Sequence, residues 1–223
     1  DASHELKTPL ASIRLLTDSL LQADHMDGET AREFLNDIGD EADRLTRITE
    51  KLLTLTRLDT APAAEDVPVD VGAVVERVEH MLSPLARAVE VSLELKLQPG
   101  CVVLATEDDL YQIAFNLMEN AVKYNLPGGR VLVTLTADGG RVVLRVEDTG
   151  VGIPEADLPK IFDRFYRVDK ARSRAAGGTG LGLSIVRDTV LQHGGAVTAR
   201  RREPEGTCFE VSFAQWNGEE VGR

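Results

Sequence analysis

The chain of 223 residues is 43% hydrophobic but only 4% aromatic, enough for one large or two modest domains with aliphatic cores. Its formal net charge of −12 argues against nonspecific binding to nucleic acid or anionic lipid, because both favour clustered lysine and arginine. No run approaches the ~20 apolar residues of a membrane span, so we expect a soluble piece without membrane contact. We interpret Cys101 and Cys208, which lack metal-ligand spacing, as reduced core residues of an intracellular protein.

The first predicted helix begins with the chain and ends near Ala23. Apolar residues three and four positions apart predict one buried face, made of Leu6, Leu10, Ile13, Leu16 and Leu20. His4 lies about half a turn from Leu6 and therefore points towards solvent. A neutral imidazole has a nitrogen lone pair that can attack phosphorus, while Glu5 could hold or deprotonate the other nitrogen. A solvated surface pair is the alternative.

A second helix is predicted from about Thr30, with apolar residues at heptad-like intervals as far as Leu55. Two helices with such narrow apolar seams form a hairpin that cannot bury itself fully. Dimerisation into a four-helix bundle would close one shared core. Pro9 lies inside the first helix, where it predicts a kink beside His4.

The domain boundary is predicted at residues 60–66, a short linker that contains alanine and proline. We therefore expect a hairpin domain at 1–59, a second domain at 67–216 and a frayed tail at 217–223. Strands are predicted at 67–70, 90–97, 101–105, 130–137, 141–147, 196–201 and 207–213, and helices at 71–86, 108–124 and 179–193. This succession predicts a two-layer α/β sandwich with a mixed sheet, and an α+β fold for the whole chain.

Two amides and a lysine share one face of the helix predicted at 108–124. Asn116 and Asn120 stand four residues apart, and Lys123 follows one turn later. Amide oxygens can complete a Mg²⁺ shell without adding a charge that repels phosphate, and Lys123 can offset triphosphate charge. An ordinary polar helix face is the alternative.

Two glycine-containing segments follow. Asp148, at a strand end before Gly150 and Gly152, could accept a hydrogen bond from an exocyclic amine such as that of adenine. A strand-ending turn is the alternative. Residues 177–183 precede a helix, where free backbone N–H groups and the helix dipole can meet phosphate. They lack the ending of a P-loop and follow no strand closely, so neither a Walker nor a Rossmann motif fits.

Aromatic and arginine side chains alternate at residues 161–167, inside a segment that otherwise has little periodicity. Aromatic residues such as Phe162 would anchor a mobile lid, while Arg167 reaches the γ-phosphate and neutralises charge during transfer. A small satellite core is the alternative.

Together these segments resemble the H-, N-, G1-, F- and G2-boxes of the sensor histidine kinases of two-component systems, in family order. The matching residues are 4–10, 116–124, 148–154, 161–166 and 178–183. The resemblance implies a dimeric histidine-phosphotransfer hairpin followed by a Bergerat-type ATP-binding domain. It implies ATP- and Mg²⁺-dependent phosphorylation of His4 and transfer to an aspartate of a response-regulator receiver domain. It also implies that this piece is the cytoplasmic portion of a membrane-anchored full-length sensor.

The resemblance also implies residue roles. His4 would be the phosphoacceptor, Glu5 its orienting base and Asn120 the Mg²⁺ ligand. Thr8, in the pattern Glu5-x-x-Thr8, would position water for hydrolysis of the partner's aspartyl phosphate. The nucleotide contacts would be Asn116, Asn120, Lys123, Tyr124, Asp148, Gly150, Gly152, Ile153, Phe162, Arg167, Gly178, Thr179, Gly180, Leu181 and Gly182.

The sequence departs from the family pattern without losing a residue essential to the chemistry. Lys7 stands where arginine is commoner, residues 110–111 lack a usual arginine, and Asn125 replaces a small hydroxyl residue. Three alternatives stay open. One is an ATPase of the gyrase, chaperone or mismatch-repair type with Glu119 as base; the second is a serine kinase related to the anti-sigma factors. The third is a dimeric scaffold that does not bind nucleotide.

Overall fold

The computed structural model describes residues 2–23, 27–60, 65–169 and 178–218. Two long helices, α1 (Ala2–Gln22) and α2 (Gly28–Thr60), precede the remaining elements. These are β1 (Val67–Asp70), α3 (Val71–Ala88), β2 (Ser92–Leu97), β3 (Val102–Ala105), α4 (Glu107–Lys123), β4 (Arg130–Asp138), β5 (Arg141–Asp148), the 3-10 turn η1 (Leu158–Lys160), α6 (Gly182–Gln192), β6 (Ala196–Arg201) and β7 (Thr207–Ala214).

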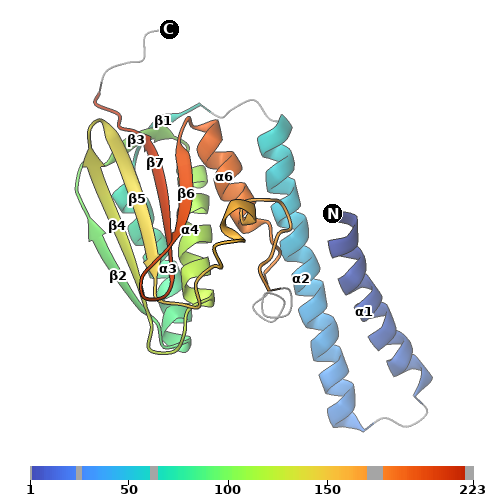
Figure 1. The fold of residues 1–223 in the computed structure, drawn as a ribbon. Coiled ribbons are helices and arrows are strands. Elements are labelled where there is room, and N and C mark those ends of the chain that lie inside the picture. Colours follow the sequence, from blue (N-terminus) through green and yellow to red (C-terminus); the bar gives the residue numbers. More distant parts are fainter. Residues whose placement is uncertain (1, 24–26, 61–64, 170–177, 219–223) are drawn as a thin grey trace.

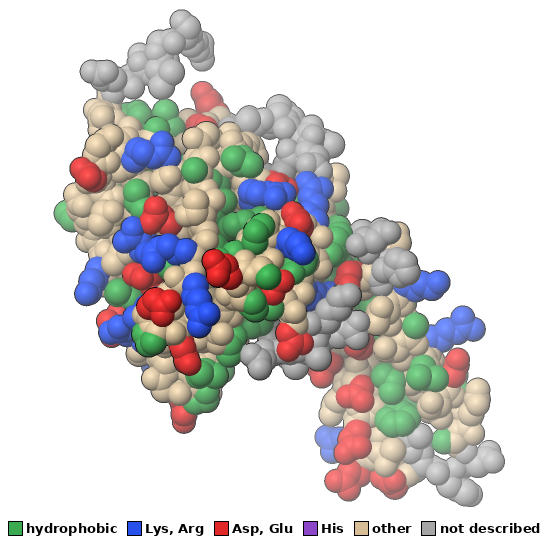
Figure 2. Space-filling model, in the orientation of Figure 1, with side chains coloured by type: hydrophobic (Ala, Val, Ile, Leu, Met, Phe, Trp, Pro, Cys, Tyr) green, Lys and Arg blue, Asp and Glu red, His purple; other side chains and the backbone are tan. Residues whose placement is uncertain are grey.

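The helices α1 and α2 lie side by side as a hairpin (Figure 1). α2 begins two residues before the predicted start, because the Asp27 carboxylate accepts bonds from the backbone N–H and hydroxyl of Thr30, both at 2.8 Å. α1 continues through Pro9. Leu10, predicted on the buried face, is 55% exposed in the single chain. Leu15, Leu35 and Leu53 are also exposed, and Figure 2 shows hydrophobic side chains gathered on the hairpin.

A mixed five-stranded sheet in the order β2-β4-β5-β7-β6 forms one layer of the second domain. β2 and β4 are parallel, and the other neighbours are antiparallel. Helices α3, α4 and α6 cover one face (Figure 1). Inward-facing valine and leucine alternate along β4 and β5, as expected for strands with one buried face. This architecture confirms the predicted hairpin followed by a two-layer α/β sandwich.

The core of the sandwich is aliphatic, with Phe209 and Phe213 at one side. Cys101 and Cys208 are fully buried, which confirms their prediction as core residues. Two of the helices that carry this core, α3 and α4, begin with a side-chain cap. Asp70 accepts from the backbone N–H of Gly72 at the start of α3, and Thr106 accepts from that of Asp109 at the start of α4.

The last helix begins later than predicted. Residues 179–181 are not helical, and α6 starts at Gly182. Gly180 has a φ of +72°, a left-handed conformation that a right-handed helix cannot contain. Most of the predicted linker and most of the tail, residues 61–64 and 219–223, lie outside the described residues. In the parts of the chain that are described, no helix combines the length and the apolarity needed to cross a membrane.

The hairpin packs against the sandwich through a small apolar cluster. Leu55 of α2 is buried against Leu181 and Ile185 at the start of α6, and Leu52 and Phe165 pack at its edge. This contact places the C-terminal part of α2 beside α6 and the glycine-rich segment that precedes it (Figure 1).

Candidate functional site

A cavity of about 800 Å³ lies where α4, the end of β5, residues 151–169 and the glycine-rich segment meet. Pockets of this size commonly hold a small molecule or cofactor. The predicted nucleotide residues that line it are Asn120, Lys123, Tyr124, Asp148, Gly152, Ile153, Arg167, Gly178, Thr179, Gly180 and Gly182. Segments far apart in the sequence are therefore brought to one cavity.

Asp148 is the last residue of β5 and is only 5% exposed. Its Oδ1 accepts the backbone N–H groups of Gly150 at 2.9 Å and of Thr207 at 3.2 Å. Burial raises the pKa of this carboxyl above its ordinary value, although the two backbone bonds oppose the shift. Both bonds use Oδ1, which leaves Oδ2 as the oxygen for a ligand donor.

Two glycines let the backbone pass close to this carboxylate. A Cβ at Gly150 would lie 2.3 Å from the carbonyl oxygen of Tyr124, and one at Gly206 would lie 1.9 Å from that of Asp148. Gly206 also has a φ of +110°. Gly206 and Thr207 are not among the predicted site residues, because the turn between β6 and β7 meets Asp148 only after the sheet is assembled.

Four predicted nucleotide residues lie outside the cavity wall. The buried Asn116 donates its amide to the carbonyl oxygen of Gln112 at 2.8 Å and packs beneath Gly182, where an added Cβ would meet its Oδ1 at 2.8 Å. The others are Gly150, Phe162 and Leu181. Phe162 packs edge-on against Phe209, with ring centroids 6.4 Å apart. Leu181 is fully buried in the hairpin contact.

The segment around the aromatic residues is joined to the glycine-rich segment through its backbone. The N–H of Phe165 donates to the carbonyl oxygen of Gly180 at 2.8 Å. A Cβ at Gly180 would come within 2.8 Å of the Phe165 backbone. The Tyr166 hydroxyl donates to Asp157 at 2.6 Å, and this bond raises the tyrosine pKa. These contacts hold the predicted lid against the cavity.

One end of the cavity is lined by charged side chains. Lys123 and Glu119, one turn apart on α4, form an ion pair at 2.8 Å. Lys51 of α2 also lines this end. Burial lowers the pKa of its ammonium group, and Glu119 opposes the shift while Lys123 and Arg47 add to it. Lys51 is not among the predicted site residues, because its helical position resembles that of any charged residue beside an apolar seam.

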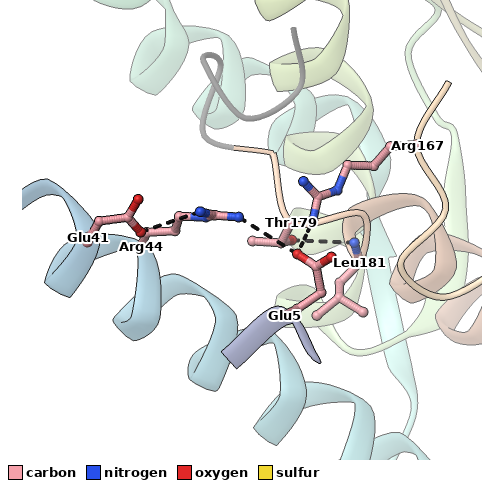
Figure 3. Close-up of polar contacts among 6 residues, drawn as sticks. All are labelled: Glu5, Glu41, Arg44, Arg167, Thr179 and Leu181. Carbon is pink, nitrogen blue, oxygen red and sulfur yellow. Dashed lines mark hydrogen bonds and ion pairs between the residues drawn. The ribbon is translucent and has the colours of Figure 1, made fainter. Parts of the chain in front are cut away.

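The hairpin and the cavity are joined by a buried arginine (Figure 3). The Arg167 guanidinium donates to the Glu5 carboxylate, and only 4% of the Arg167 side chain is exposed. Arg44 of α2 approaches the same carboxylate at 3.7 Å and pairs with Glu41 at 3.4 Å. The side chain of His4 lies outside the described residues, but its backbone belongs to α1, directly before Glu5.

The chain matches two known families. Residues 105–216 match the family described as "Histidine kinase-, DNA gyrase B-, and HSP90-like ATPase", and residues 1–61 match the "His Kinase A (phospho-acceptor) domain". The fold and the cavity therefore define an ATP-using domain attached to a phosphoacceptor hairpin. The chain belongs to the sensor histidine kinases of two-component systems.

Individual relatives agree with this family. The sensor-like histidine kinase SenX3 of Mycolicibacterium smegmatis is 35% identical over 97% of this chain and 56% of that protein. The structure of the mycobacterial sensor histidine kinase MprB is 32% identical, with a TM-score of 0.58 over 67% of this chain and 97% of that one. Full-length ShkA in complex with AMPPNP is 31% identical, with a TM-score of 0.70 over 96% of this chain and 45% of that one. The chain spans about half the length of the curated relatives it matches.

Proposed function

We propose that this chain is the catalytic core of a histidine kinase that transfers the γ-phosphoryl group of ATP to His4 and then to an aspartate of a response-regulator receiver domain. One observation carries the proposal. Arg167 lines the nucleotide-sized cavity and also binds Glu5, the residue that follows His4. The proposed phosphate donor and acceptor sites thus share one side chain.

The cavity suits a purine nucleotide. Asp148 Oδ2 would accept the adenine amine, and the open backbone at Gly152 would let the ring approach. The N–H groups from Gly180 to Gly182 lie at the start of α6, where the helix dipole favours phosphate. The related ShkA was solved with AMPPNP, an ATP analogue, which supports this assignment.

The donor set also suits Mg²⁺ carried by the nucleotide. The described residues contain no group of three or more His, Cys, Asp and Glu side chains that could hold a metal ion alone. Asn120 lines the cavity and would supply an amide oxygen to Mg²⁺, an ion that takes few protein ligands and completes its shell with substrate phosphates and water. When bound, the ion would neutralise charge on the phosphates.

The transfer step is an in-line displacement. The His4 imidazole forms a nitrogen–phosphorus bond, the bond between the γ-phosphorus and its bridging oxygen breaks, and ADP leaves. Glu5 would take up or hold the imidazole proton, while Arg167 stabilises charge on the phosphoryl oxygens. Because Arg167 binds Glu5 in this structure, we infer that it must exchange Glu5 for phosphate before transfer.

A homodimer through the hairpin completes the proposal. The single chain exposes Leu10, Leu15, Leu35 and Leu53 along α1 and α2. A second hairpin would cover this apolar surface and form a four-helix bundle. The exposed part of α1 around His4 would then be the docking surface for the receiver domain.

Thr8 favours a second activity at the same helix. It lies one turn after Glu5 on the exposed side of α1, where it could orient water for hydrolysis of an aspartyl phosphate. Loss of phosphate from a phosphorylated receiver domain would measure this activity. We expect Thr8→Ala to slow it at least tenfold and Thr8→Ser to preserve it; equal rates in all three proteins would remove Thr8 from the proposal.

The test of the main function is incubation with γ-labelled ATP and Mg²⁺, followed by acid or alkali. We expect a label on the protein that is lost in acid, survives alkali and does not form in His4→Gln. Acid-stable label would indicate a serine kinase. Steady ATP turnover without labelled protein would indicate a gyrase-type ATPase in which Glu119 acts as base.

A further inference from the structure

Lys51 belongs to the hairpin but lines the nucleotide cavity of the other domain. Among the described residues of the hairpin, it is the one whose side chain forms part of the cavity wall. None of the five sequence motifs contains it. Its position therefore needs an explanation beyond the proposed reaction.

The apolar contact between the two domains fixes where Lys51 lies. The next residue, Leu52, packs at the edge of the cluster formed by Leu55, Leu181 and Ile185. This cluster holds the C-terminal part of α2 against the start of α6. Lys51 consequently lies at the end of the cavity lined by Glu119 and Lys123 whenever the domains are docked in this way.

The charges around Lys51 do not balance. Glu119 already pairs with Lys123 at 2.8 Å, so two ammonium groups share one carboxylate at this end of the cavity. Arg47 adds further positive charge nearby. Burial also disfavours the charged form of Lys51, as the lowered pKa of its ammonium group indicates. An anion in the cavity would offset both effects.

We propose that Lys51 is a phosphate contact supplied by the hairpin, through which the polyphosphate of ATP or ADP stabilises docking of the α/β domain on α2. This inference rests on the proposed function, because it assigns a nucleotide to the same cavity. By linkage, the docked arrangement must then bind nucleotide more tightly than the separated domains, and nucleotide must favour docking to the same extent.

The test is calorimetric titration of the whole 223-residue chain with ADP, AMPPNP and adenosine. Lys51→Gln removes the charge, and Lys51→Arg keeps it. Arg57→Gln is the matched control, since Arg57 is an exposed cation on the same helix outside the cavity wall. Lys51→Gln should weaken ADP and AMPPNP about tenfold, as expected for a lost charge-assisted contact.

Lys51→Gln should bind adenosine as the unsubstituted chain does. The other two variants, Lys51→Arg and Arg57→Gln, should bind all three ligands nearly as the unsubstituted chain does. The rise in melting temperature on adding ADP should also be smaller for Lys51→Gln. Equal weakening of adenosine and ADP would indicate a packing role and overturn the inference. Unchanged ADP affinity in Lys51→Gln would overturn the inference alone, whereas failure of the unsubstituted chain to bind any nucleotide would overturn the proposed function as well.

Discussion

The cavity inside the α/β domain and the junction with the hairpin are built from different interactions. Backbone groups shape the cavity: two N–H groups bind Asp148, and Phe165 bonds to Gly180. Side chains make the junction, through Glu5 with Arg167 and through the cluster around Leu55. The junction can therefore open without breaking the backbone bonds of the cavity. This difference suits a kinase whose nucleotide site must stay formed while the domain moves relative to His4.

The largest expected effect is on the backbone of the cavity. Gly180→Ala should lower the free energy of unfolding by about 3 kcal/mol, because the new Cβ combines a left-handed φ with a clash against Phe165. Chemical denaturation measures the loss. Gly139→Ala is the control: its φ is also positive, at +56°, but nothing lies within 4 Å of the added Cβ. Equal losses in the two variants would show that the close contact with Phe165 is unimportant.

Asp148→Asn should weaken ADP binding about 100-fold, since a neutral amide oxygen replaces a carboxylate and its amino group opposes the adenine amine. Asparagine keeps one oxygen for the N–H groups of Gly150 and Thr207, so the fold should survive. Calorimetry measures the affinity. Asp138→Asn, at the exposed end of β4, should bind ADP normally. A change of less than threefold at Asp148 would contradict its role at the adenine.

The apolar half of the junction is probed by Leu55→Ala. Loss of this buried side chain should cost about 2 kcal/mol of docking free energy, as for other large-to-small changes in apolar contacts. Hydrogen exchange at the start of α6 should become faster, while exchange along β4 and β5 stays the same. Leu191→Ala, on the exposed side of α6, should change neither. Faster exchange throughout the sheet would mean that the junction and cavity are not separable.

The smallest effect concerns His193, which follows α6 and is enclosed by acidic groups. Its Nε2 lies 2.9 Å from Asp109 at the start of α4, and its Nδ1 lies 3.1 Å from Asp66 before β1. The bond to Asp109, followed by the charge of Asp66, raises the imidazole pKa although burial opposes it. The same bond lowers the pKa of Asp109. Protonated His193 thus binds Asp66, the last residue of the predicted linker, to the sandwich.

The raised pKa of His193 and the lowered pKa of Asp109 determine how the free energy of unfolding depends on pH. His193 adds its full contribution to the free energy of unfolding below its unfolded pKa of about 6.5. This contribution disappears as the pH rises through the raised pKa of the folded state. The contribution of Asp109 is present above its unfolded pKa of about 3.9 and is lost as the pH falls through the lowered pKa of the folded state. Between about pH 4 and 6.5 we expect the unsubstituted chain to be more stable than His193→Gln by on the order of 1 kcal/mol. This difference should decrease as the pH rises through the raised pKa of His193 in the folded state. Denaturant melts across pH measure it, and a constant difference would refute it.

Much of the fold could be predicted because strands and helices follow local periodicity. The two glycine-containing segments and one face of α4 were also predicted to form a nucleotide site, and the structure brings them to one cavity. Two helix boundaries were predicted wrongly, for different reasons. α6 begins late because Gly180 adopts a left-handed conformation against the Phe165 backbone, which is a tertiary contact. α2 begins early because Asp27 caps it through Thr30, a local signal that the apolar periodicity does not include. Gly206 and Lys51 could not be found from the sequence, since each meets the cavity only after distant segments assemble.

The central claim is that the cavity serves phosphoryl transfer to His4, and locating the phosphate tests it most directly. The chain would be incubated with ATP and Mg²⁺, digested at neutral pH and analysed by mass spectrometry beside His4→Gln. The account predicts one phosphorylated position, residue 4, and no phosphopeptide in the variant. Phosphate on another residue, or ATP consumption with no phosphorylated residue, would contradict it.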